Sequence, residues 1–491
     1  MPSDPLLLSE SHEWSGLWWL PDAPDTRVPG VLRYDRDGGA SLSLIGTFEN
    51  RIMTEVSPGV KAVHEGSRTW EVMHGVAESR EITLLGCVPT GTHRTLGARV
   101  ASPDKQVVRA QSVLVGVHAA GEDDALFESV QVSVENLDRW AAAEVFSGFL
   151  GAPEGKRFDG SGSISAKPLE STSVVVDGTE FTLDHRRTAP SFDERRGGTT
   201  GRIRDSAFVR IAPPEACSLS GAIRSAKSIQ DLISLATHRA AGVIWLRLKL
   251  TGEGPGAERH PAERGVEVLY SPAAVGERDA KAIDHGKVFF TCDDIAFEEV
   301  VPRWCEVSDR LHAATDLILA LRYAPAQYVE SRLLMAAGAA EALHRALDIE
   351  ERPMPSAEFK EMRDAMLELA PEDQRERLKG AIRNDVTLRD RLRALAARPD
   401  QQAVSELVPD LDRWARRTVK ARNDLAHKGA TPDHSIEELV AVVEATTGVV
   451  ILDLLHEIGL PADRQRAIVR EHPQLRSIAG WAKAELVTPE A

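Results

Sequence analysis

The stretch Arg422-Asn423-Asp424-Leu425-Ala426-His427 decides how the last third of this chain is interpreted. It closes a run whose members recur every three or four residues, the spacing of one helix face: Leu407, Leu411, Trp414 or Ala415, Thr418, Arg422, and Leu425 or Ala426. Arg422 therefore falls on or beside a buried face, where a guanidinium needs a carboxylate, carbonyl or phosphate opposite it. His427 follows just over one turn later, and Lys428-Gly429 signals the helix end. The stretch places a permanent cation near a side chain that titrates close to neutral pH, which suits an RNA phosphodiester.

An arginine and a histidine at this spacing also have a purely structural interpretation. In that alternative, Arg422 forms an ion pair with a neighbouring helix and His427 complements the negative end of the helix dipole. Glu341, on an earlier predicted helix, is the candidate carboxylate for Arg422. A solvated position on the surface of its helix is the equally weighted alternative for Glu341.

Length and composition restrict the class of protein. A chain of 491 residues is too long for one compact core, so we expect two or three domains. Its net charge of −16 argues against a generally basic protein that coats nucleic acid. Contact with RNA therefore requires a local basic patch, for which the motif region supplies the candidates Arg416, Arg417, Lys420 and Lys428. Because such a charge run wraps most of a helix, part of it is plain solvated charge.

The cysteines and the apolar runs indicate a compartment. Four widely separated cysteines (Cys87, Cys217, Cys292 and Cys305) include no Cys-x-x-Cys pair, which predicts a reducing cytoplasm with neither disulfides nor a zinc site. The first five residues lack the basic segment of a signal peptide. The apolar run 449–452 falls far short of the ~20 residues of a membrane span. We therefore expect a cytoplasmic protein with no membrane partner.

Residues 1 to about 300 have the pattern of a mostly β domain, in which short alternating runs are separated by Gly, Pro and Asp. Strands are expected near residues 13–20, 31–34, 40–46, 70–76, 81–87, 94–100, 111–117, 127–134, 171–176, 179–183, 206–211 and 243–250, with helices after 134 and at 223–236. The segments 188–200 and 251–264 are expected to be mobile loops. Trp14, Trp18, Trp19 and Trp70 are expected in the core, with base stacking as the alternative.

From about residue 300 the apolar spacing changes to that of helices. Helices are expected at 304–323, 327–347, 356–369, 374–397, through the motif, and from a capping box at Ser435-Ile436-Glu437-Glu438 onward. Five or six amphipathic helices with short connections predict a bundle. The fold class is therefore α+β and multidomain: 1–300 mostly β, 301–460 a helical bundle, and 461–491 a polar tail.

The chain resembles a known two-domain architecture. Its Arg-Asn-Asp-x-x-His stretch in the penultimate long helix, with Ala340-Glu341-Ala342-Leu343 on an early helix, is similar to the HEPN ribonucleases. The preceding half resembles the ApeA-type N-terminal domain of bacterial anti-phage proteins. That resemblance rests on the order of Gly16-Leu17-Trp18-Trp19-Leu20-Pro21, the Pro29-Gly30 hairpin, the His74-Gly75 strand with its Thr83-Leu84-Leu85 partner, and Phe127…Leu137…Trp140.

The resemblance implies a metal-independent endoribonuclease without a cofactor, acting as a toxin in abortive infection. It implies that His427 is the acid/base and that Arg422 holds the phosphate. Asn423 would orient the phosphate or backbone, and Asp424 would set the imidazole tautomer or lower the local positive charge. The family places two copies of the motif at one cleft, so a homodimer or a higher even-numbered oligomer is expected. The partners implied are RNA, with tRNA the guess from related toxins, and a phage-derived trigger at the N-terminal domain.

Two other functions remain open from the sequence. In one, the bundle is a non-cleaving module that binds nucleotide or RNA through Arg422 and the basic face, and His427 is dispensable. In the other, the β half recognises a partner and the bundle only dimerises, so that Arg422 is dispensable as long as the dimer survives.

Overall fold

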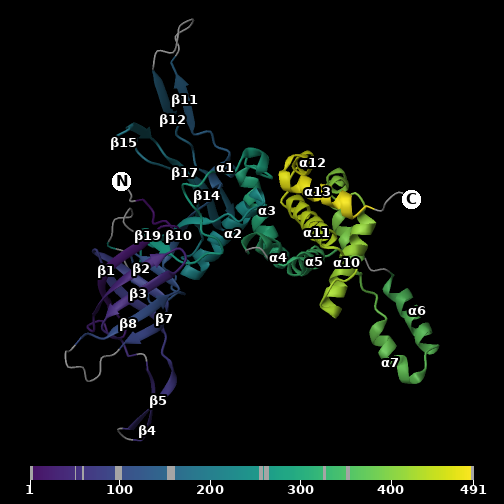
Figure 1. The fold of residues 1–491 in the computed structure, drawn as a ribbon, viewed down its shortest axis with the longest axis horizontal. Helices are drawn as coiled ribbons and strands as arrows, with labels where there is room; N and C mark the ends of the chain where they lie inside the picture. Colours follow the sequence, from purple (N-terminus) through teal and green to yellow (C-terminus); the bar gives the residue numbers. More distant parts are fainter. Residues whose placement is uncertain are drawn as a thin grey trace. The chain divides into compact units, whose positions relative to one another are not determined.

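A computed structural model describes residues 4–49, 51–57, 60–93, 102–151, 161–253, 258, 265–324, 328–349 and 354–487, with the side chains of 51–56 and 60–67 outside the description. The chain forms two compact units, Met1–Pro302 and Arg303–Ala491. The division falls close to the boundary predicted at 300/301. The expected α+β class, mostly β and then helical, is confirmed (Figure 1).

The first unit is built around one large sheet. Its strands are β1 His12–Trp19, β2 Val28–Asp35, β3 Gly39–Ile45, β6 Trp70–Ala77, β7 Arg80–His93, β8 Lys105–Ala110, β9 Ser112–Val115, β10 Phe127–Val134, β13 Thr172–Val176, β14 Thr179–Arg187, β17 Asp205–Ala212, β18 Val243–Leu250 and β19 Gly265–Leu269. Their spatial order is β13-β14-β17-β10-β18-β19-β9-β7-β6-β1-β2-β3-β8. An additional β7–β8 pairing closes β7, β6, β1, β2, β3 and β8 into a ring. Three further hairpins are β4 Arg51–Ser57 with β5 Val60–Ser67, β11 Phe146–Leu150 with β12 Gly162–Ala166, and β15 Ser191–Arg195 with β16 Gly198–Arg202.

The tryptophans of the ring are core residues, as expected. Trp14, Trp18, Trp19 and Trp70 are all buried. Gly75 lies opposite Trp18 in the β1–β6 pairing, and a Cβ at that position would come within 2.2 Å of the indole ring. Any other residue at position 75 would therefore displace this buried ring, which explains why the glycine sits in mid-strand.

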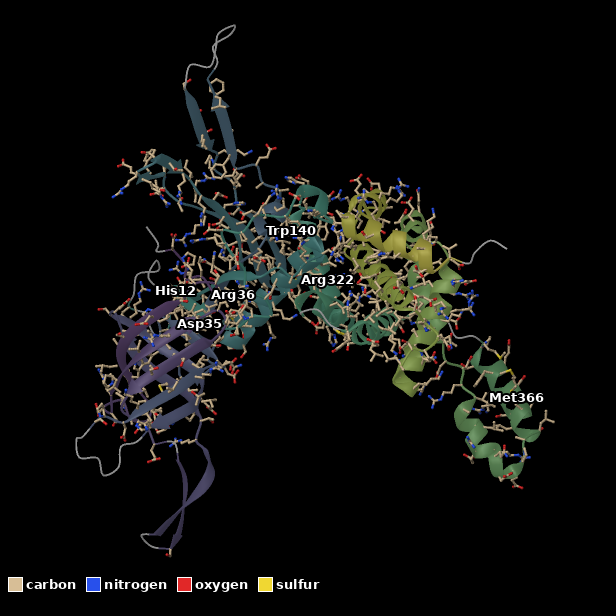
Figure 2. All side chains as sticks on the ribbon, in the orientation of Figure 1. His12, Asp35, Arg36, Trp140, Arg322 and Met366 are labelled. Atoms are coloured by element: carbon tan, nitrogen blue, oxygen red, sulfur yellow. The ribbon has the colours of Figure 1, made fainter. Side chains whose placement is uncertain are left out.

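The open part of the sheet is covered on one face by α2 Leu219–Thr237, which contacts β10 and β18. Ser218 caps this helix by accepting a hydrogen bond from the Gly221 backbone N–H at 3.3 Å. The short helix α1 Leu137–Ala141 follows β10, as predicted, and buries Trp140, which Figure 2 labels.

The second unit is a helical bundle. Its helices are α3 Phe297–Arg310, which begins in the first unit, α4 His312–Tyr323, α5 Val329–Ala346, α6 Ser356–Glu368, α7 Glu372–Ala381, α8 Leu388–Ala396, α9 Gln401–Leu407, α10 Leu411–Lys428, α11 Ile436–Glu457, α12 Ala462–Glu471 and α13 Pro473–Glu485. The central helix is α11, which contacts α4, α5, α8, α9, α10 and α13. By contrast, α6 and α7 bury none of their residues, and Met366 of α6 is exposed (Figure 2).

One helix, α11, has the length and composition of a membrane span, although 89% of its most apolar window is buried inside the unit. The four-residue run identified in the sequence underestimated this apolar segment. Its burial on all sides identifies it as the core of the bundle, because a helix that is hydrophobic all round needs partners all round.

Several predicted elements are wrong in detail. The single helices expected at 304–323 and 374–397 are each two helices, α3 with α4 and α7 with α8. Leu407 ends α9 and is separate from α10, and Ile436, expected to point inward, is exposed. The loop expected at 188–200 is largely the β15–β16 hairpin. In the tail from 461, the sequence predicts one short helix near Arg464 to Arg470, which α12 matches, whereas α13 was not expected. Both helices pack on α9, and α13 also packs on α11. The strand expected at 94–100 and most of the loop at 251–264 lie outside the described residues.

Candidate functional site

The Arg-Asn-Asp-x-x-His stretch lies in the last turns of α10, and both ends of this helix are capped. Asp410 accepts a hydrogen bond from the Arg413 N–H at 2.9 Å, an N-cap. Gly429 ends the helix in the left-handed region, with a φ of 69°, and its N–H donates to the Leu425 carbonyl at 3.0 Å. The caps fix where the helix stops, and therefore where His427 stands.

The buried face of α10 passes beside Arg422. It consists of Trp414, Ala415, Thr418, Ala421 and Asp424. The Trp414 indole N–H donates to the Thr446 hydroxyl of α11 at 3.1 Å, which fixes α10 against the central helix. Arg422 lies at the border of this face, with 35% of its side chain exposed.

Arg422 is held by a carboxylate on a neighbouring helix. Its Nη2 lies 3.1 Å from Oε1 of Glu341 on α5, and its Nη1 donates to the Asn423 side-chain oxygen at 3.2 Å. Glu341 is 17% exposed and also pairs with Arg345 at 3.4 Å. Of the two positions open to Glu341, the ion pair is the one present. A guanidinium has five N–H donors, so Arg422 retains donors on its exposed side for a phosphate.

His427 is exposed in the last turn of α10 and has no hydrogen bond or ion pair among the described residues. Five helical residues correspond to roughly 7.5 Å along the axis and about 140° around it. Arg422 and His427 therefore occupy the same end of one helix but different sides of it. Arg422 reaches α5, whereas His427 faces solvent.

Asp424 is engaged by lysines rather than by the histidine. Its Oδ1 lies 2.8 Å from Lys428 Nζ and its Oδ2 lies 3.2 Å from Lys420 Nζ, and Lys420 also pairs with Asp433 at 2.6 Å. Hydrogen bonding to Lys428 is the main reason that the pKa of Asp424 is lowered. Asp424 therefore lies beside two lysine charges at this end of α10.

The candidate RNA-binding residues have different surroundings. Arg417 forms a two-pronged ion pair with Glu438 of α11 and donates to the Asp433 carbonyl at 2.7 Å. Lys420 and Lys428 are paired with aspartates as described above. Arg416 is exposed and has no ion pair within the described part of the chain. Arg416 is therefore the candidate whose charge is most available to a ligand.

One group of side chains in the described residues has the spacing of metal ligands, and it lies in the first unit. Asp138, His185 and Asp205 place their ligand atoms within 4.8 Å of one another. His185 Nδ1 lies 2.7 Å from Asp205, Arg187 lies 3.2 Å from the other oxygen of Asp205, and Asp138 accepts the Ala207 N–H at 2.6 Å. These internal partners already satisfy the group.

The helical unit, with Arg422 and His427 at the end of α10, has the properties of a HEPN domain, and residues 334–464 match the family model Apea-like HEPN. Residues 13–304, more than half of the chain, match ApeA N-terminal domain 1. The chain therefore belongs to the ApeA family, in which this N-terminal domain precedes an ApeA-like HEPN domain. No curated protein and no solved structure matches it. The assignment supports an anti-phage, HEPN-containing protein, and HEPN domains are generally ribonucleases.

Proposed function

We propose that this protein is a metal-independent endoribonuclease that acts in bacterial anti-phage defence by abortive infection, in the cytoplasm. The observation that carries the proposal is the end of α10. There, Arg422 is anchored by Glu341 yet partly exposed, and His427 is exposed with no partner among the described residues. This arrangement supplies a phosphate-binding cation and a proton-transfer group.

RNA carries its own nucleophile, which limits what the protein must supply. The ribose 2′-hydroxyl loses its proton and its oxygen bonds to phosphorus, while the bond to the 5′-oxygen breaks and that oxygen takes up a proton. The products are a 2′,3′-cyclic phosphate and a 5′-hydroxyl. In this proposal His427 transfers protons, a role worth about 10²–10⁴-fold in rate. Arg422 stabilises the charge that develops on the phosphate oxygens, and Asn423 holds the guanidinium.

A single histidine cannot give and take a proton at opposite sides of the phosphate in one step. The reaction therefore favours two copies of the motif at one cleft, which an isologous homodimer provides. The angular separation of Arg422 and His427 on α10 supports the same arrangement, because one copy would present each group to a different side. We propose that the site is composite, with both α10 helices at a twofold interface.

Some restraint is required, because a constantly active ribonuclease would destroy the RNA of its host. We propose that the first unit provides this control and responds to a phage-derived trigger. The RNA substrate remains a proposal as well, and tRNA is the first to test.

The test incubates the purified full-length protein with total RNA in EDTA and maps the termini of the products. We expect cleavage that leaves cyclic phosphate ends, and a loss of at least about 100-fold in Arg422→Ala and His427→Ala. His456→Ala is the matched control, because His456 is also an exposed histidine in the last turn of a helix. Arg345→Ala removes the other partner of Glu341 and should leave cleavage intact. Cleavage that requires added metal, or that persists in both motif variants, would remove the mechanism.

The two alternative functions predict different results in infected cells. If the bundle only binds nucleotide or RNA, His427→Ala retains phage protection. If it only dimerises, Arg422→Ala retains protection provided that the dimer persists in sedimentation experiments.

A further inference from the structure

A second candidate site lies on the polar face of the open sheet in the first unit, on β14, β17, β10, β18 and β19, several of which Figure 1 labels beside α2. The alternate face of these strands is apolar and includes Val130, Val132, Leu246 and Leu248, all buried. Because successive side chains point to opposite faces, the residues between these apolar positions share the polar face.

The strand register brings these polar-face residues into rows across the sheet. One row runs Thr182–Arg210–Gln131–Arg247–Glu267. The next row runs Asp184–Phe208 on β14 and β17 and continues with Ser133–Trp245 on β10 and β18. Basic and aromatic side chains of β17 and β18, which are separated in the sheet by β10, therefore lie in adjacent rows.

A cavity of about 730 Å³ opens on this face, and cations dominate its lining. The cations are Arg186, Arg187, Arg210, Arg247 and Lys249. Glu128, the only acidic residue that lines the cavity among those described, pairs with Lys249 at 2.6 Å. The carboxylates that orient the arginines lie outside the lining. Arg210 pairs with Glu180 at 3.2 Å, and Arg247 pairs with the buried Glu267 at 3.2 Å. These pairings hold the guanidinium groups in place before a ligand arrives, which reduces the entropy lost on binding.

The position of Arg247 depends on a glycine. A Cβ on Gly265, the residue at the start of β19, would lie 2.4 Å from Nη2 and 2.5 Å from Nε of Arg247. The guanidinium therefore occupies space that only glycine leaves open. A backbone that makes room for an oriented cation beside a cavity is a feature of a built site.

The same cavity contains an aromatic pair. The rings of Phe208 and Trp245 lie 5.6 Å apart at an angle of 49°; Trp245 is buried and Phe208 is partly exposed. An aromatic surface beside several guanidinium groups matches a ligand that carries both a flat ring and a phosphate. The volume of the cavity lies within the range of small-molecule sites, about 300–1,000 Å³.

We propose that this cavity binds a nucleotide, with the phosphates at Arg210, Arg247 and Lys249 and the base against Phe208. The site is independent of the ribonuclease proposal, because none of its residues belongs to the helical unit. It gives the first unit a small-molecule ligand.

The test is isothermal titration calorimetry on the full-length protein at constant salt. The probes are ATP, GTP, CTP and UTP, compared with inorganic triphosphate, adenosine, and a short single-stranded RNA whose 2′-positions are methylated to prevent cleavage. We expect at least one nucleotide to bind about tenfold or more tightly than triphosphate, adenosine or the RNA. Equal binding of triphosphate, or tighter binding of the RNA than of every nucleotide, would overturn the proposal.

Three variants locate the binding. Arg210→Gln removes a charge, Phe208→Leu removes a ring but not its apolar volume, and Gly265→Ala displaces the Arg247 guanidinium without changing charge. Each should weaken nucleotide binding about tenfold, and Lys249→Gln replaces any variant that fails to fold. The control Arg33→Gln breaks an exposed ion pair with Glu13 on another part of the sheet and should bind normally. Unchanged affinity in Arg210→Gln and Gly265→Ala would show that the nucleotide binds elsewhere.

Discussion

Two arginines of α10, little more than one turn apart, have different surroundings. Arg417 is fixed by two hydrogen bonds to Glu438 and a third to the Asp433 carbonyl, so its charge is neutralised within the bundle. Arg422 has one interhelical carboxylate, Glu341, and keeps a more exposed side. A run of basic residues in a sequence therefore divides, once the chain is folded, into residues that hold helices together and residues that are available to a ligand.

Exchanging the charges of the Arg422 pair should give the largest effect. The double variant Glu341→Arg/Arg422→Glu restores the ion pair between α5 and α10 with its ends reversed, whereas Arg422→Glu alone opposes two carboxylates. If Arg422 holds a phosphate, RNA cleavage by the double variant stays at least about 100-fold below wild type while its melting temperature recovers. Recovery of both the rate and the melting temperature would make Arg422 a purely structural residue.

Removing the locked arginine should affect stability instead. Arg417→Ala leaves the nearly buried carboxylate of Glu438 without its partner, and we expect a loss of about 2 kcal/mol in the free energy of unfolding of the helical unit. The neighbour Arg416 is exposed, so Arg416→Ala should change stability by less than about 0.5 kcal/mol. If Arg416 contacts RNA, Arg416→Ala should reduce the slope of log affinity against log salt concentration by the equivalent of about one phosphate contact. Urea unfolding and RNA titrations at several salt concentrations measure both effects; equal stability of the two variants would contradict the distinction.

The end of α10 can be weakened without touching either arginine. Gly429→Ala forces a Cβ into the left-handed region at a φ of 69°, with no neighbouring atom within 4 Å, so the strain lies in the backbone alone. We expect the free energy of unfolding to fall by about 1 kcal/mol. The RNA cleavage rate should fall by less than about tenfold, because the last turn of α10, which carries His427, frays. Asparagine tolerates the left-handed conformation better than alanine does, so Gly429→Asn should lose less stability and less cleavage activity than Gly429→Ala. Thermal melts and cleavage rates compare the pair, and equal losses would argue against a backbone origin.

The smallest effect concerns acid stability at the same helix end. Bonds to Lys428 and Lys420 lower the pKa of Asp424, and Lys420 does the same for Asp433. A lowered carboxyl pKa gives stability that is present above the unfolded value of about 3.9 and is lost as pH falls through the folded value. The melting temperature of wild type should therefore exceed that of Asp424→Asn from neutral pH down to about 5, with the gap closing below about 4. High salt should narrow the gap, and a gap that widens in acid would refute this assignment.

The local features of the site were readable from the sequence. Apolar spacing placed α10, Lys428-Gly429 marked its end, and Glu341 was the right acid on an earlier helix for Arg422. The Arg417–Glu438 pair was missed because the basic run contains several cations, and only packing decides which of them meets an acid of α11. The sequence feature that could have indicated this pair is Glu438, an acid in the first turn of α11. Ser435 caps that helix, as the capping box predicted.

The predicted helix boundaries are wrong at α9/α10 and α7/α8, where a proline or an N-cap residue marks the division more weakly than apolar spacing marks a helix. Pro409 follows Val408 and restricts its backbone, and Asp410 then begins α10, so Leu407 could not belong to the same helix. Thr387 caps α8 through the Asp390 N–H at 3.3 Å and marks the division within 374–397.

Other misreadings came from composition. Gly197 and Gly198 suggested a loop, but Arg196 and Gly197 form the tight turn between β15 and β16, and Gly198 begins β16. The polar composition from 461 onward suggested a tail, but Pro473 occupies the first turn of α13, where proline is well tolerated. The cavity of the first unit was beyond local reading, since strand order brings its arginines together and only the fold sets that order.

The apolar helix α11 has a consequence for synthesis of the protein. Before it is packed, this helix is a segment that membrane-insertion machinery could recognise or that could aggregate, since its length and composition are those of a membrane span. Most of the helices that it contacts, α4, α5, α8, α9 and α10, precede it in the chain, and α13 follows it. When α11 leaves the ribosome, these earlier helices have already been translated, so the surfaces that bury its apolar side chains in the folded unit are already synthesised.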